Sequence, residues 1–99
     1  MNKSGTRAVH PGEVLLKDYI QPMGASVNFI AQSLHIPTSR LSEIVRGRRG
    51  ISADTALRLQ QLFGSEANGW MTLQSQYELQ VAFEAAGKDI AAQIKPLES

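Results

Sequence analysis

Apolar residues recur along most of this chain at spacings of three and four, which is the period of a helix that buries one face. A first helix is predicted to begin at Pro11, because proline is tolerated in a first helical turn, and to end before Pro22 and Gly24. Its expected core-facing residues are Val14, Leu15, Tyr19 and Ile20. No strand-like alternation of useful length occurs, so the pattern predicts an all-α fold.

Two short helices are predicted next, with a tight turn between them. Ser26 is a suitable N-cap for the first of the two, and His35 lies where a helix end often needs a left-handed residue. Pro37 redirects the chain into the second, Thr38–Arg46, which Gly47 ends. The predicted buried residues are Phe29, Ile30 and Leu34 in the first helix and Leu41, Ile44 and Val45 in the second.

Two further helices complete the predicted fold. Ser52 would cap the fourth helix, with Asp54 near its positive end, and Gly64 would close it. Ser65 would cap a longer fifth helix that is interrupted at Ala86-Gly87. Their expected apolar stripes are Ala56, Leu59, Leu62 and Phe63 in the fourth helix and Trp70, Leu73, Tyr77 and Val81 in the fifth.

The fifth helix carries a second apolar pair, Leu79 and Phe83, which is turned by roughly 200° from Tyr77 at about 100° per residue. One core cannot bury both faces. A homodimer would bury the pair through this helix, and collapse of the C-terminal tail onto it is the competing explanation.

Composition narrows the function classes. Ninety-nine residues suffice for one domain, and the absence of cysteine excludes disulfides, thiolate nucleophiles and cysteine-based zinc sites. No apolar run of about 18 residues and no secretory signal occurs, so we expect a cytoplasmic protein without a membrane partner. The two histidines, His10 and His35, lie far apart without clustered carboxylates, which favours structural roles and predicts no metal, no cofactor and no enzymatic activity.

The second and third helices match a helix-turn-helix arrangement, in which the second of the pair enters the major groove of DNA. The net charge is only +1, yet four arginines fall within the ten residues from Arg40 to Arg49. The candidate base-reading residues are Thr38, Ser39, Arg40, Ser42 and Glu43. The candidate phosphate contacts are Arg46, Arg48 and Arg49, with Asn28 as a weaker one. A merely solvated polar face is the competing interpretation of this surface.

The predicted organisation therefore has three parts. Residues 1–10 form a flexible arm, residues 11–86 form the helix-turn-helix domain with a long dimerising fifth helix, and residues 87–99 form a loosely ordered tail.

A set of short motifs, in order and at matching spacing over residues 10 to 80, resembles the HigA-type antitoxins. The motifs are His10-Pro11-Gly12-Glu13, Pro22-Met23-Gly24, Leu41-Ser42, Arg46-Gly47-Arg48, Gly50-Ile51-Ser52, Ala56-Leu57-Arg58-Leu59, Phe63-Gly64 and Trp70-Met71-Thr72-Leu73-Gln74. The resemblance implies a five-helix, lambda repressor-like domain that acts as a homodimer on a palindromic operator. It also implies a cognate toxin, a HigB-like ribosome-dependent messenger RNA endonuclease. His35, Pro37 and Glu43 depart from the usual family pattern.

The sequence is compatible with three alternative functions. The first is a sequence-specific repressor and antitoxin that regulates its own operon and neutralises the toxin by direct contact. The second is a solitary regulator of the same fold without a toxin. The third is a helical adaptor that binds only protein, through Leu16 or through Leu79 and Phe83.

Overall fold

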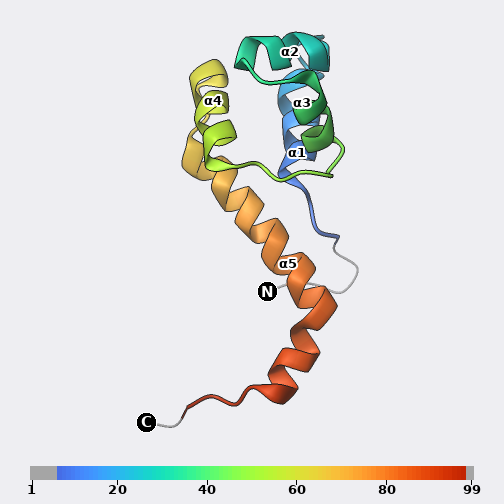
Figure 1. Cartoon of the computed structure of the whole chain (residues 1–99), viewed down its shortest axis with the longest axis vertical. Helices are drawn as coiled ribbons and strands as arrows, with labels where there is room; N and C mark the ends of the chain where they lie inside the picture. The colour runs from blue at the N-terminus through green and yellow to red at the C-terminus, as the bar shows by residue number, and fades with distance from the viewer. Residues whose placement is uncertain (1–6, 98–99) are drawn as a thin grey trace.

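The structure, a computed structural model, describes residues 7–97, and every regular element in that range is helical (Figure 1). This confirms the all-α, five-helix prediction with an extended last helix, while the expectations for residues 1–6 and 98–99 lie outside the described residues. The elements are α1 (Pro11–Val14), η1 (Leu15–Ile20), α2 (Val27–Leu34), α3 (Thr38–Val45), α4 (Ala53–Phe63) and α5 (Ala67–Gln93).

The predicted first helix consists of α1 and η1, which follow each other without a break. His10 caps its start, because its ring nitrogen Nδ1 accepts a hydrogen bond of 2.8 Å from the backbone N–H of Gly12. The second half is π-helical, and its wider turn shows in the bond from the N–H of Gln21 to the carbonyl of Leu16. Apolar periodicity does not reveal this widening, because Leu15 and Ile20 are buried either way.

Local chemistry set most of the helix ends as expected. Ser26 and Ser52 cap α2 and α4 by accepting hydrogen bonds from backbone N–H groups three residues on. His35 takes the left-handed conformation with φ 59°, and Gly47 and Gly64 close α3 and α4 with φ 75° and 78°. Ser65 is not the cap of α5, however. Glu66 holds that position, and the Ser65 hydroxyl instead accepts a 2.9 Å hydrogen bond from the indole of Trp70.

The core lies between the first four helices and the first turns of α5. Leu15, Ile30, Leu41, Ile44, Leu59 and Trp70 are among its buried members. Leu16, a candidate docking residue of the protein-binding adaptor, is half-buried and packs against this core. Three residues expected on buried stripes are exposed instead: Phe29, Leu62 and Val81. In α2 the buried places belong to Ile30, Ala31 and Leu34, so Phe29 faces away from the core.

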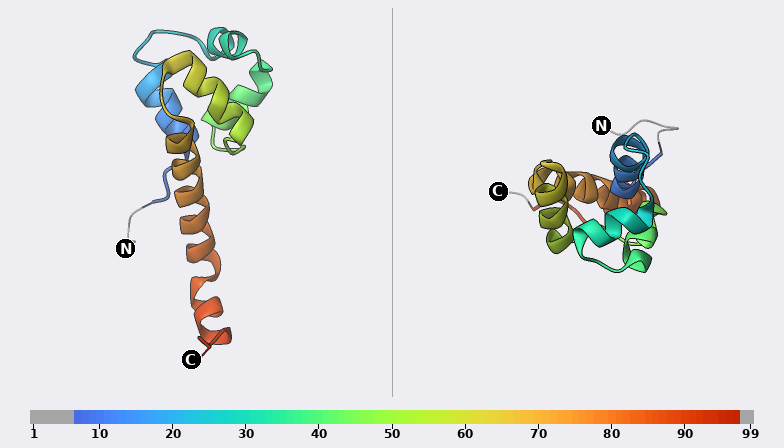
Figure 2. Two further views of the ribbon diagram at one scale, coloured as in Figure 1. Left: turned by 90° about the vertical axis from the view of Figure 1, so that its left-hand side faces the viewer. Right: turned by 90° about the horizontal axis from the view of Figure 1, so that it is seen from above.

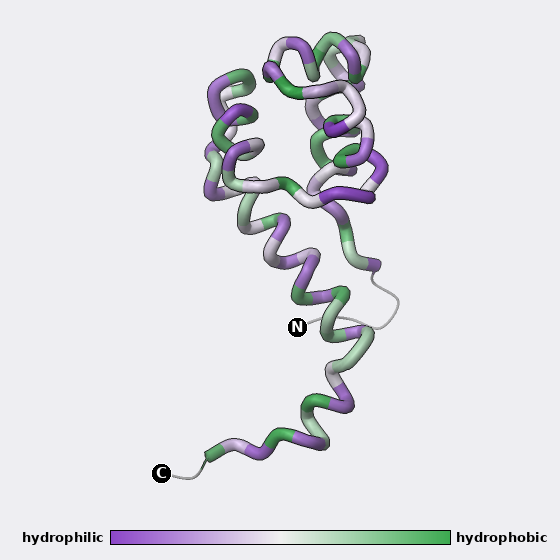
Figure 3. The backbone as a smooth tube through the Cα atoms, in the orientation of Figure 1, coloured by the Kyte–Doolittle hydropathy of each residue, from purple (hydrophilic) through white to green (hydrophobic). Residues whose placement is uncertain are grey.

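The fifth helix leaves the compact head and extends far beyond it without a break, and its lower, orange-red part bends to a new direction (Figures 1 and 2). It continues through Ala86-Gly87, where we expected an interruption, and ends at Gln93. At about 1.5 Å per residue its 27 residues span roughly 40 Å. Hydrophobic positions recur along the part outside the head (Figure 3). Among the described residues, no helix combines the length and apolar character needed to cross a membrane.

Candidate nucleic-acid interface

The third helix separates its apolar and polar residues onto opposite sides. Leu41 and Ile44 are fully buried and fix the helix on the core, while Thr38, Ser39 and Arg46 are exposed. Ser42 and Glu43 are half-buried. The predicted reading face therefore exists as a surface, with hydroxyl groups at the N-terminal end of α3 and a cation after its C-terminal end.

Asn28 lies beside the start of α3 although ten residues separate it from Thr38. The Thr38 hydroxyl donates a 2.7 Å hydrogen bond to the Asn28 side-chain oxygen, and both residues are exposed. The amide group of Asn28 thus keeps its N–H donors for a ligand outside the protein. The turn between α2 and α3 brings together these two residues, which the sequence had placed in the same interface.

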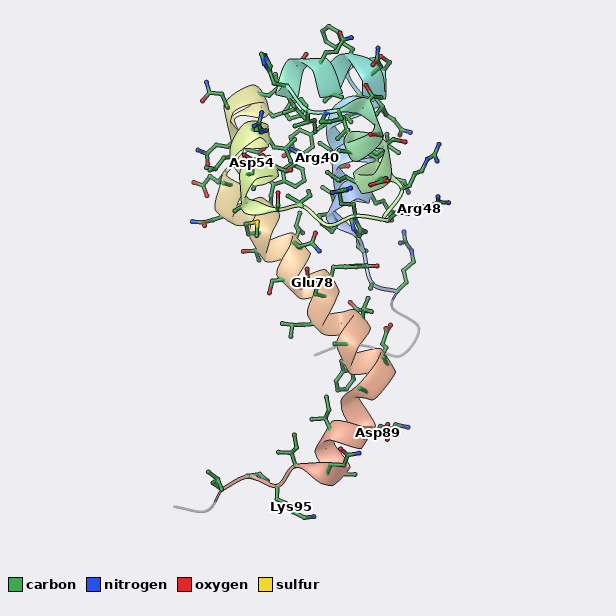
Figure 4. All side chains as sticks on the ribbon, in the orientation of Figure 1. Arg40, Arg48, Asp54, Glu78, Asp89 and Lys95 are labelled. Carbon is green, nitrogen blue, oxygen red and sulfur yellow. The ribbon has the colours of Figure 1, made fainter. Side chains whose placement is uncertain are left out.

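Arg40 points from α3 toward α4 rather than straight outward. Its guanidinium nitrogen Nη2 lies 3.3 Å from Asp54 Oδ2 in α4 (Figure 4 labels both residues). Its side chain is only 30% exposed, and its Nε atom is buried without a hydrogen-bond partner among the described residues. As a predicted base reader, Arg40 would have to exchange Asp54 for a base.

Arg58 of α4 joins the same carboxylate, and sequence reasoning did not assign it a site role. Its Nε donates to Asp54 at 2.8 Å, and its Nη1 donates to the backbone carbonyls of Leu34 and His35. The hydrogen bond from Arg58, together with the charges of Arg58 and Arg40, holds the pKa of Asp54 below its ordinary value. Arg58 thereby fastens α4 to the end of α2, which holds the helix-turn-helix pair against the rest of the head.

The loop after α3 carries the remaining predicted phosphate contacts. Arg46, Arg48 and Arg49 are exposed, and Arg48 extends away from the head in Figure 4. Arg49 Nε donates a 2.8 Å hydrogen bond to Glu43, so one predicted base reader pairs with one predicted phosphate contact. Among residues 7–97, neither Arg46 nor Arg48 forms an ion pair, which leaves both charges available.

His10 has the structural role that the sequence predicted for it. Its ring is buried and meets the Tyr77 ring edge-on, with centroids 4.7 Å apart. Burial lowers the pKa of His10 below its ordinary value, and a hydrogen bond with the backbone of Arg49 opposes this in part. Within the described part of the chain, no cluster of histidine and carboxylate side chains could hold a metal ion.

Leu79 and Phe83 lie on the part of α5 outside the head and are 68% and 62% exposed. The ring of Phe83 lies against Gly87, yet both side chains stay exposed, so the described residues up to 97 do not bury this apolar pair. Their predicted role in dimerisation remains a prediction.

The chain is similar in sequence and in structure to known proteins. No family model matches the chain. The chain is 49% identical over 80 residues to virulence-associated protein I of Dichelobacter nodosus, which covers 81% of this chain and 74% of that protein. The Pseudomonas aeruginosa antitoxin HigA, solved with the higBA promoter, superposes with a TM-score of 0.90 at 41% identity and covers 93% of this chain and 100% of that one. An addiction module antidote protein of a HigA family from Coxiella burnetii gives a TM-score of 0.88 at 39% identity, over 93% and 100% of the two chains.

Proposed function

Since this chain belongs to the HigA-type family of helix-turn-helix antitoxins, we propose that it binds operator DNA as a transcriptional repressor and neutralises a partner toxin. The operator would be that of its own operon, and the toxin a HigB-like messenger RNA endonuclease. The protein acts by binding rather than by catalysis, and it acts in the cytoplasm, where operator and toxin are found.

The exposed face of α3 and the arginine loop carry this proposal. Hydroxyl groups at the start of α3 suit hydrogen bonding with base edges, and Arg46 and Arg48 have free charges where a phosphate backbone would pass. The HigA relative solved with its promoter supports the same assignment. Affinity then comes mainly from phosphates and selectivity from base edges.

Arg40 of α3 is suited to contact a base, although it pairs with Asp54 in the free protein. Its Nε atom has no acceptor inside the described protein, whereas a guanine offers two acceptors to one guanidinium. Moving from Asp54 to a base would therefore satisfy a donor that is unused in the free protein. Arg58 would remain on Asp54 and keep that carboxylate partnered.

The protruding half of α5 supports action as a homodimer. Leu79 and Phe83 are large, apolar and exposed on α5. Pairing of two such helices would bury both residues and join two reading helices. Two helices about 34 Å apart can read successive turns on one side of B-DNA, which corresponds to a palindromic operator.

The salt dependence of DNA binding tests this function. Fluorescence anisotropy with the DNA upstream of the gene and with a scrambled duplex gives log affinity against log salt for each. The double variant Arg46→Ala, Arg48→Ala should weaken binding to both duplexes and reduce the slope by about 0.9 per lost phosphate contact. Lys95→Ala is the matched control, because it removes an exposed cation at the far end of the chain, labelled in Figure 4.

Selectivity needs a second arm of the same experiment. Ser39→Ala should lower the preference for the operator over the scrambled duplex, because it removes a hydroxyl group that can bond to a base edge. Wild-type protein without salt-sensitive binding would overturn the proposal and favour the protein-binding adaptor. Co-purification with the product of an adjacent small gene separates the antitoxin from a solitary regulator.

A further inference from the structure

The arginine loop between α3 and α4 is tied to α5 by one buried side chain, that of Gln74. Its Oε1 accepts a 2.8 Å hydrogen bond from the backbone N–H of Ile51, across 23 residues of sequence. Its Nε2 donates a 2.8 Å hydrogen bond to Glu78 one turn further along α5. Gln74 and Ile51 are both buried, so water does not readily replace the hydrogen bond between them, whereas Glu78 is exposed.

The neighbours of Gln74 leave its amide only one useful orientation. A backbone N–H can only donate, so it requires the amide oxygen, and an ionised carboxylate can only accept, so it requires the amide nitrogen. Rotating the amide by half a turn would therefore break both hydrogen bonds. Glu78 holds the side chain of Gln74 in the orientation that binds the loop.

Gly50 lets the loop approach this amide closely. A Cβ atom at position 50 would lie 2.8 Å from Nε2 and 3.1 Å from Oε1 of Gln74, closer than side chains normally pack. The loop backbone therefore rests directly on the amide group. Any larger residue at this position must push the loop and the amide apart.

The other end of the loop rests on α5 indirectly, through the ring of His10. A Cβ atom at Gly47 would lie 3.7 Å from the ring of His10, and this ring rests edge-on against Tyr77 of α5. Gln74 and Tyr77 are one helical turn apart, so the same face of α5 supports both ends of the loop. Arg48 and Arg49 lie between these two supported points.

We propose that Gln74 is a positioning residue for DNA binding. Its hydrogen bond to the backbone of Ile51 holds the loop in the position from which Arg48 and Arg49 reach the phosphates of DNA. This inference rests on the proposed function and adds a residue that does not itself touch DNA. Because the loop grips the backbone and α3 reads the bases, loss of Gln74 changes affinity for every sequence alike. Selectivity, which depends on α3, stays unchanged.

The test uses two perturbations from opposite sides of the contact. Gln74→Met keeps the length of the side chain and removes the acceptor, while Gly50→Ala leaves Gln74 intact and pushes it away. Each should flatten the plot of log affinity against log salt by about one unit per lost phosphate contact, equally for operator and scrambled DNA. Gly69→Ala is the control, because a Cβ there meets nothing within 4 Å.

Rescue and a local probe exclude a merely structural effect. The double variant Gln74→Glu, Glu78→Gln keeps the net charge and again offers an oxygen to the Ile51 N–H, so it should recover the wild-type salt slope. Amide hydrogen exchange at Ile51 should be fast in Gln74→Met and Gly50→Ala and slow in the double variant.

Each outcome decides between the hypotheses. Wild-type slopes in Gln74→Met and Gly50→Ala overturn the positioning role while the proposed function stands. Failure of the double variant to recover the slope, although Ile51 exchange is again slow, also overturns it. If Gln74→Met does not fold, Gly50→Ala alone decides, and wild-type protein without salt-dependent binding rejects the proposed function itself.

Discussion

Replacing Gly12 by alanine should push α3, the helix that we propose to read the DNA bases, away from α1. A Cβ atom at Gly12 would lie 1.8 Å from the carbonyl oxygen of Ile44 and 2.6 Å from its carbonyl carbon. These are backbone atoms of α3, so no side-chain rotation relieves the clash, and the last turn of α3 must retreat by more than an ångström. Gly12 therefore packs directly against the backbone of α3.

The expected cost follows from what must move. Overpacking a core typically costs about 1–3 kcal/mol, and a contact between backbone atoms belongs at the upper end of that range. A loss of about 3 kcal/mol is a large part of a total stability of roughly 5–15 kcal/mol, and it lowers Tm by roughly 12–24 °C in a domain of this size. Operator affinity should fall as well, because the exposed face of α3 is displaced relative to the rest of the head.

Gly69→Ala provides the matched comparison. Gly69 lies inside α5, and a Cβ there meets nothing within 4 Å, so the change should stabilise the protein by up to about 1 kcal/mol. Urea denaturation and anisotropy with operator DNA measure both variants. If Gly12→Ala matched Gly69→Ala in urea midpoint and in affinity, the close contact between α1 and α3 would be refuted.

Two more predictions concern α5 and His10. Phe83→Glu should convert the dimer to monomer in analytical ultracentrifugation and weaken operator binding, while Lys95→Ala leaves both unchanged; a dimeric Phe83→Glu would remove this residue from the interface. The pKa of His10 is lowered in the folded state from an unfolded value of 6.5, so its contribution to stability is present above pH 6.5 and is lost as the pH falls below it. Urea midpoints from pH 8 to pH 5 should therefore decline, and His10→Asn, which still offers a cap acceptor, should flatten the decline; equal slopes in both proteins would contradict this role.

Most helix ends other than those of α5 were predictable, because each depends on a few adjacent residues. A serine before an apolar repeat can accept the free N–H groups of a helix start, and Gly64 adopts a positive φ at low cost wherever the helix must stop. His35 followed the same local logic. The side of α3 that carries hydroxyl groups was also readable, because the helical period alone separates it from Leu41.

The features that sequence reasoning missed depend on which elements meet in space. Phe29 is spaced like a core residue of α2, yet its side chain is exposed. The packing of α2 on the other helices determines which face is buried, and the helical period alone does not show this. Arg40 was placed correctly on α3, yet its Asp54 partner comes from α4, 14 residues away. Gln74 stood out only as the last residue of a motif shared with HigA-type antitoxins, and its role could not be predicted because its partner is a backbone group 23 residues earlier.

The length of α5 makes the folding of its C-terminal part depend on the concentration of the protein. Isolated helices of fewer than about 12–15 residues are marginal in water, and no residue of α5 from Leu79 to Gln93 is buried. If a second copy supplies the missing contacts, part of the folding free energy is bimolecular and rises with the logarithm of protein concentration. The C-terminal end of α5 would then fray at low protein concentration and become helical as the concentration rises. The helical fraction of this segment would therefore depend on the concentration of the protein.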